Sequence, residues 1–154
     1  MIQCVSHLKH RTVLLTLYAA GLRLAEATNL KVRDIDSQRM QLKINGGKGG
    51  KDRYVPISQR LLEELRAYWK IDRPSNYLFP GKTPDVPLSG ATIQRACKMA
   101  AALARINKNV TPHTMRHYSW KRPVARSYTL GSLSLYERKS YKTIQAILVR
   151  DAKR

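Results

Sequence analysis

The chain has 154 residues, of which 29 are lysine or arginine and 10 are aspartate or glutamate, so its formal net charge is +19. A hydrophobic fraction of 43% is enough for one packed core and excludes general disorder, and no run of eighteen apolar residues predicts a transmembrane helix. The charge favours a polyanion as partner, most commonly nucleic acid, with a solvated basic surface or a ribosome-associated protein as the alternative.

Two features of the sequence bear on the compartment. The N-terminal residues contain no apolar signal core beside a small-residue cleavage site, so export is not expected. The two cysteines, Cys4 and Cys97, lie far apart, which favours reduced thiols over a disulfide framework or a zinc site. Together these observations predict a cytoplasmic protein without a membrane partner.

The first half of the chain predicts two helices followed by a hairpin. Residues 7–20 are apolar on more than one face, which indicates a buried helix, and Gly21 is expected to end it. A short second helix is expected over residues 24–30, and it carries Glu26. Residues 39–57 alternate in polarity on either side of the glycine-rich stretch NGGKGGKD, which predicts an antiparallel β-hairpin.

The second half predicts two longer helices. Ser58 is a suitable N-cap for a helix through Trp69, whose core-facing residues should be Leu62, Leu65 and Trp69. Residues 72–89 hold four prolines and form a connector, with a short strand at NYLF. Residues 91–104 predict a helix that turns inward Ile93, Cys97, Ala100 and Leu103. The expected fold is therefore mainly α with a small antiparallel β-sheet (α+β).

The stretch VTPHTMRHYSW predicts a further helix with a charged first turn. Thr111 is a good N-cap and Pro112 a good first helical residue. His113 then lies in the first turn, and Arg116, three residues on, shares its face. Because a helix N-terminus favours anions, this pattern predicts a phosphate receptor. The alternative is that His113 only packs or caps and that Arg116 pairs with an acid.

Three segments in this order, YAAGLRLAEATNLKVRDID, GGKGGKDRYVPIS and TPHTMRH, resemble the catalytic domain of the tyrosine recombinase (phage integrase) family. The resemblance runs from about residue 7 to residue 117, and the segments LLEELRAYW, YLFPGKTP and IQRACKMAA between them look most like integrases of bacterial mobile elements. It implies a site-specific DNA recombinase that cleaves and rejoins DNA through a 3′-phosphotyrosine.

The resemblance assigns roles to individual residues. The arginine of the G-L-R box, Arg23, would bind the scissile phosphate, and the first lysine of the hairpin, Lys48, would protonate the leaving 5′ oxygen. His113 and Arg116 match the H-x-x-R box, and Glu26 matches an acidic position that would orient Arg23. Each also has a structural reading, such as a helix-capping arginine or an ordinary turn lysine.

Further expectations concern binding. We expect Lys51, Arg53 and His117 to contact DNA, and Lys51 and Arg53 could do so without taking part in catalysis. Neither a metal ion nor another cofactor is expected, because the chemistry needs none and no carboxylate cluster is seen in the sequence. The implied partner is double-stranded DNA, on which the chain could form homo-oligomers, in a bacterial cytoplasm and associated with the nucleoid.

The resemblance stops within the chain, which predicts a catalytic core over residues 1–117 and an atypical basic tail over residues 118–154. No histidine follows His117, so the family's L-G-H box is absent as written. Tyr141 is the nearest candidate nucleophile, at a shorter distance from Arg116 than the family pattern requires. The tail is either divergent or the product of a shifted reading frame, since SWKRPV can be encoded by bases that give Leu-Glu-Ala-Ala-Gly one frame away.

These departures leave the function open between three readings. The first is a recombinase domain whose reaction is incomplete or inactive; it also begins without the N-terminal DNA-clamping domain that family members usually carry. The second is a non-catalytic DNA-binding remnant or regulator that occupies recombination sites. The third is a basic RNA-associated protein in which the three motifs are coincidental.

Overall fold

The computed structural model describes residues 1–46 and 50–120, with the side chain of residue 120 excepted. Within this part the elements follow in the order η1 (Ile2–Cys4), α1 (Leu8–Ala20), α2 (Leu24–Thr28), η2 (Val32–Asp34), β1 (Ile35–Asp36), β2 (Gln41–Ile44), β3 (Arg53–Pro56), α3 (Gln59–Asp72), α4 (Gly90–Leu103) and α5 (Pro112–Trp120). The prediction of a mainly α fold with a small antiparallel sheet is confirmed.

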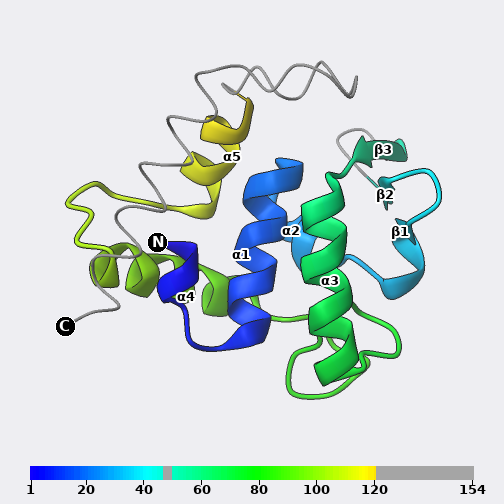
Figure 1. Cartoon of the computed structure of the whole chain (residues 1–154), viewed down its shortest axis with the longest axis horizontal. Helices are drawn as coiled ribbons and strands as arrows, with labels where there is room; N and C mark the ends of the chain where they lie inside the picture. The colour runs from blue at the N-terminus through cyan, green and yellow to red at the C-terminus, as the bar shows by residue number, and fades with distance from the viewer. Residues whose placement is uncertain (47–49, 121–154) are drawn as a thin grey trace. The chain divides into compact units, whose positions relative to one another are not determined.

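Helix α1 is the centre of this arrangement and packs against α3, α4 and α5 (Figure 1). Its residues Val13, Leu14 and Leu17 have no exposed surface, as expected for a helix that is apolar on several faces. The two buried threonines, Thr12 and Thr16, donate their hydroxyl hydrogens to carbonyls one turn back, at 2.9 and 2.8 Å. The hydroxyl groups of these two threonines are thus satisfied within the helix itself.

The sheet has three antiparallel strands in the order β1-β2-β3. Strands β2 and β3 form the predicted hairpin, and β1 is an additional strand that was not predicted. Leu42 in β2 pairs with Ile35 in β1 and with Val55 in β3. Strand β1 has only two residues, too short to give a recognisable alternation. The tip of the hairpin, residues 47–49, lies outside the described residues.

Helix α3 begins as predicted, because the Ser58 hydroxyl accepts a hydrogen bond from the Leu61 amide at 3.2 Å. The expectation that Trp69 faces the core is wrong. Tyr68 is the fully buried residue and hydrogen-bonds Asp72 at 2.9 Å, whereas Trp69 is 39% exposed. The Arg73 guanidinium lies over the Trp69 ring at 4.8 Å, so the indole has a cationic partner at the surface instead of an apolar one.

Two further expectations need correction. Leu103 is 62% exposed, because the buried stripe of α4 runs through Ile93, Cys97 and Ala100 and leaves Leu103 on its flank. NYLF forms no strand; only Tyr77 makes a bridge there, with Lys31. Its neighbour Leu78 donates its amide hydrogen to the Leu30 carbonyl at 2.7 Å, which ties the connector to the end of α2.

Candidate functional site

The turn between α1 and α2 places the first arginine of the site. Gly21 adopts a left-handed conformation at φ 60°, as predicted for the residue that ends this helix, and its amide bonds to the Leu17 carbonyl. Leu22 is then fully buried, which anchors the turn, and Arg23 becomes the N-cap residue of α2. The turn therefore presents the Arg23 side chain at a fixed point of the surface.

Glu26 is the acidic residue on which three arginines converge. Its carboxylate accepts hydrogen bonds from the Arg23 amide at 2.7 Å, from Arg23 Nη1 at 2.9 Å and from Arg53 Nη2 at 2.8 Å. Arg116 Nη1 lies 3.5 Å from the same carboxylate. The Glu26 side chain is only 8% exposed, so these guanidiniums supply its counter-charge in place of water.

The charges of this cluster shift two pKa values. Burial raises the pKa of Glu26, but the hydrogen bonds from Arg23 and the charge of Arg53 outweigh burial and hold that pKa below its ordinary value. The pKa of Arg116 is lowered by burial and by the nearby charge of Arg23, with Glu26 opposing the shift. Arginine stays protonated throughout the accessible pH range, so the cluster carries excess positive charge.

Helix α5 starts with the cap that the sequence predicts. The Thr111 hydroxyl accepts a hydrogen bond from the Thr114 amide at 3.1 Å, and the Thr114 hydroxyl accepts one from the Thr111 amide at 2.8 Å. Pro112 is the first helical residue, and His113 follows it with an exposed side chain. Arg116 Nη1 donates to the Gly21 carbonyl at 2.8 Å, so α5 is tied to the turn that carries Arg23.

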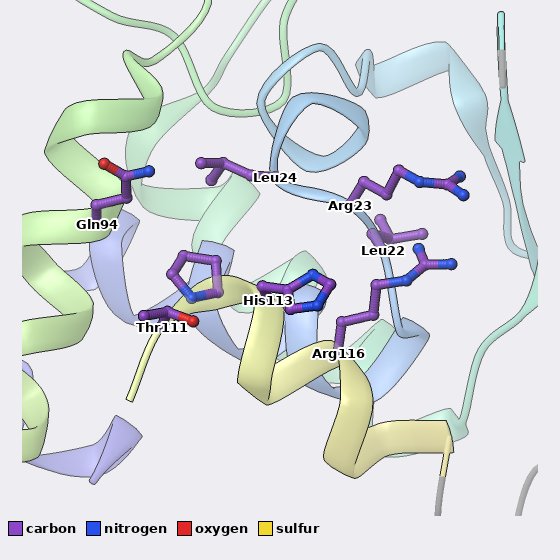
Figure 2. A pocket seen from close by; sticks show the side chains of 8 residues that line it. Leu22, Arg23, Leu24, Gln94, Thr111, His113 and Arg116 are labelled. Atoms are coloured by element: carbon purple, nitrogen blue, oxygen red, sulfur yellow. The ribbon is translucent and has the colours of Figure 1, made fainter. Parts of the chain in front are cut away.

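These elements surround a pocket of about 390 Å³. Figure 2 shows Arg23 and Arg116 on one side of it, His113 at the start of α5, and Gln94 reaching it from α4 on the other side. The remaining lining residues are Leu22, Leu24, Thr111 and Pro112. With two guanidiniums, an imidazole and a helix N-terminus around one hollow, the pocket suits a tetrahedral anion with several acceptor oxygens.

The structure brings three of the predicted site residues together at the pocket. Arg23, His113 and Arg116 line the pocket, although residues 23 and 113 are far apart in sequence. Lys51 and His117 are exposed and are not among the residues that line it. Lys48 and Tyr141 lie outside the described residues, as does most of the proposed tail.

Two features of the site could not be read from the sequence. Gln94 lines the pocket, yet it appears in the sequence only as one polar residue of a helical segment. Arg53 was expected to contact DNA, and the structure places its guanidinium on Glu26. In the sequence, Arg53 is recognisable only as the first residue of a strand, which pairs with Ile44 in the structure. That position does not indicate a contact with Glu26, which lies 27 residues away in the sequence.

The described part of the chain contains no group of three His, Cys, Asp or Glu side chains arranged to hold a metal ion. Among the same residues, no helix has both the length and the apolar character needed to cross a membrane.

The described part of the chain is a helical domain with a small sheet and a pocket lined by two arginines and a histidine, and comparison with known proteins identifies its family. The model of the phage integrase family matches residues 2–122, so the chain belongs to that family. The chain is 52% identical over 114 residues to a protein of Sinorhizobium fredii described as an integrase/recombinase, y4qK, covering 74% of this chain and 37% of the relative.

Two further comparisons agree with this assignment. The chain is 38% identical over 120 residues to tyrosine recombinase XerA of Pyrococcus horikoshii, covering 76% of this chain and 41% of the relative. The crystal structure of XerA recombinase superimposes with a TM-score of 0.67 at 31% identity, over 77% of this chain and 44% of that one. The resemblance to tyrosine recombinase catalytic domains is confirmed, and the chain spans less than half the length of these relatives.

Proposed function

We propose that the pocket binds a phosphate of duplex DNA, and that the chain is the phosphate-binding part of a site-specific recombinase. One observation carries this proposal: Arg23, His113 and Arg116 line one pocket. The buried Glu26 carboxylate forms ion pairs with both of these arginines. The net charge of +19 supports a polyanionic partner, and membership of the phage integrase family supports DNA as that partner.

In the proposed reaction, a tyrosine hydroxyl releases its proton to water as its oxygen bonds to the scissile phosphorus, the bond from phosphorus to the 5′ oxygen breaks, and a 3′-phosphotyrosine remains. Arg23 and Arg116 would neutralise the charge that grows on the non-bridging oxygens, since forked guanidiniums match such oxygens well. His113 would donate a further hydrogen bond from the start of α5, and Lys48 would protonate the leaving oxygen as general acid. Lys51 and His117 would contact flanking phosphates.

We further propose that this chain binds the phosphate without completing the reaction. Residues 118–154 contain no histidine to supply an L-G-H box at the expected distance, and Tyr141 stands closer to Arg116 than the family pattern requires. A nucleophile must be in line with the phosphate, so a tyrosine at a different spacing is not equivalent.

The first test measures affinity for a duplex oligonucleotide as a function of salt. Affinity should fall steeply as salt rises, and Arg116→Ala should weaken binding about tenfold or more, because it removes charge-assisted hydrogen bonds. Arg39→Ala is the matched control, since Arg39 is an exposed arginine that pairs only with Asp36, at 3.9 Å, among the contacts of the described residues. An equal loss in both variants, or an affinity that ignores salt, contradicts the proposal.

A second test addresses the reaction itself. A nicked suicide duplex should yield no covalent protein–DNA product with this chain. If a covalent product forms and Tyr141→Phe abolishes it, the chain is an active recombinase and the proposal of an incomplete reaction is wrong. Preference for RNA over duplex DNA, together with indifference to Arg23→Ala, would instead favour an RNA-associated protein.

A further inference from the structure

Arg53 belongs to the charged cluster but does not line the pocket. It is the first residue of β3, and its Nη2 donates to Glu26 Oε2 at 2.8 Å. Its other terminal nitrogen, Nη1, is buried and has no hydrogen-bond partner. The pocket is lined by Arg23 and Arg116 but not by Arg53, so Arg53 is placed to act on the two pocket arginines through their shared carboxylate.

The two oxygens of Glu26 are used unequally. Oε1 accepts from Arg23 Nη1 at 2.9 Å, while Oε2 accepts from the Arg23 amide at 2.7 Å and from Arg53 at 2.8 Å. A carboxylate oxygen has two lone pairs, so these two donors satisfy Oε2. Arg116 Nη1 is held at 3.5 Å from that oxygen and donates to the Gly21 carbonyl at 2.8 Å.

We propose that Arg53 is a positioning residue: by occupying Glu26 Oε2 it prevents Arg116 from closing onto Glu26 and keeps the Arg116 guanidinium at the pocket. This inference rests on the proposed function only in taking the anion of the pocket to be phosphate. Strand β3 would thereby set the position of an arginine on α5. The two elements are distant in sequence.

The inference makes a definite statement about the loss of Arg53. Without its Nη2, Oε2 regains a free lone pair, and Arg116, whose Nη1 lies 3.5 Å from that oxygen, is placed to take it. An Arg116 that donates fully to Glu26 offers fewer hydrogen bonds to a phosphate. Removal of Arg53 should therefore weaken phosphate binding, and it should do so only when Glu26 is a carboxylate.

The experiment is a double-mutant cycle on the full chain with inorganic phosphate as the probe, titrated at constant ionic strength and followed by the NMR signals of the arginine Nε groups. Arg53→Gln should weaken phosphate binding about threefold or more, the size expected when residues of one ion-pair network are coupled. In the Glu26→Gln background the same change should have no more effect than Arg39→Gln, an exposed arginine of the same charge.

Equal losses in the two backgrounds would mean that Arg53 contacts phosphate directly and would overturn the inference. An unchanged affinity in Arg53→Gln, or no phosphate binding by the unaltered chain, would overturn it as well. If Arg53→Gln does not fold, Arg53→Lys serves in its place, since a single ammonium keeps the charge but not the geometry of the guanidinium. Its smaller loss should again disappear in the Glu26→Gln background, and persistence of the loss there would contradict the proposal.

The pKa of Glu26, measured by NMR of its side-chain carboxyl carbon, gives a second readout, because it reports whether Arg53 pairs with that carboxylate in solution. Arg53→Gln should raise that pKa toward its ordinary value, and Arg39→Gln should leave it unchanged. A rise in the Glu26 pKa that is as large in Arg39→Gln as in Arg53→Gln would contradict the inference. Binding of duplex DNA by the unaltered chain separates the two proposals. If the unaltered chain does not bind duplex DNA but the double-mutant cycle on phosphate binding gives the expected result, only the proposed function is refuted.

Discussion

The buried threonines of α1 and the Glu26 carboxylate are both withdrawn from water, but their polar groups are satisfied in opposite ways. Thr12 and Thr16 in α1 bond to carbonyls of their own helix. Glu26 takes its partners from its own turn, from β3 and from α5. The first region is satisfied as soon as a helix forms, whereas the second is satisfied only when the tertiary structure is complete.

The largest expected effect falls on the interior. Leu17→Ala removes a side chain with no exposed surface and should lower the free energy of unfolding by about 2–5 kcal/mol, because a cavity remains where the side chain packed. Urea denaturation measures this change. Leu103→Ala is the matched control: its side chain is 62% exposed, so the loss should stay within about 0.5 kcal/mol. Comparable losses in the two variants would contradict the assignment of Leu103 to the surface.

A smaller effect is expected at the cluster. Glu26→Gln leaves three guanidiniums without their common counter-charge and should lower the free energy of unfolding by about 1–2 kcal/mol, less than for a fully buried pair because the arginines are partly exposed to water. The pKa of Glu26 is lower in the folded state, so its contribution is present above the unfolded pKa, which is 4.5, and is lost as pH falls through the folded value.

Denaturation at pH 7 and at stepwise lower pH measures this dependence. The difference between the unaltered chain and Glu26→Gln should shrink as the pH falls below 4.5. A difference that is constant down to the lowest pH would show that the carboxylate charge does not stabilise the fold.

The smallest effect concerns the two thiols, and it distinguishes buried from accessible positions without altering stability. Burial raises the pKa of Cys97 to about 11, and its side chain is fully buried, whereas Cys4 is half-buried. Because the thiolate is the reactive form, a thiol reagent such as DTNB should modify Cys4 of the native chain quickly and Cys97 only after unfolding. Rapid modification of Cys97 in the native protein would contradict the packing of α4.

Much of the fold could be predicted from local signals. Gly21, Ser58 and the pair Thr111–Pro112 each mark a helix boundary through backbone geometry or a cap, and the structure has helix ends at all three places. Two of the predictions that failed, at Trp69 and Leu103, depended on which flank of a helical stripe meets the core. That choice is made by the neighbouring element and not by the periodicity of the helix alone.

In the candidate site, too, some features could be predicted from local sequence signals and others could not. Arg23, His113 and Arg116 were identified by motif, and the cap at Thr111 by its residue type, because each signal lies within a few adjacent residues. The convergence of Arg23, Arg53 and Arg116 on Glu26, and the place of Gln94 in the pocket, were decided only by the tertiary structure. The physical reason is distance along the chain: a cap or a turn is complete within one turn of backbone, while a carboxylate shared by three elements exists only after those elements have packed.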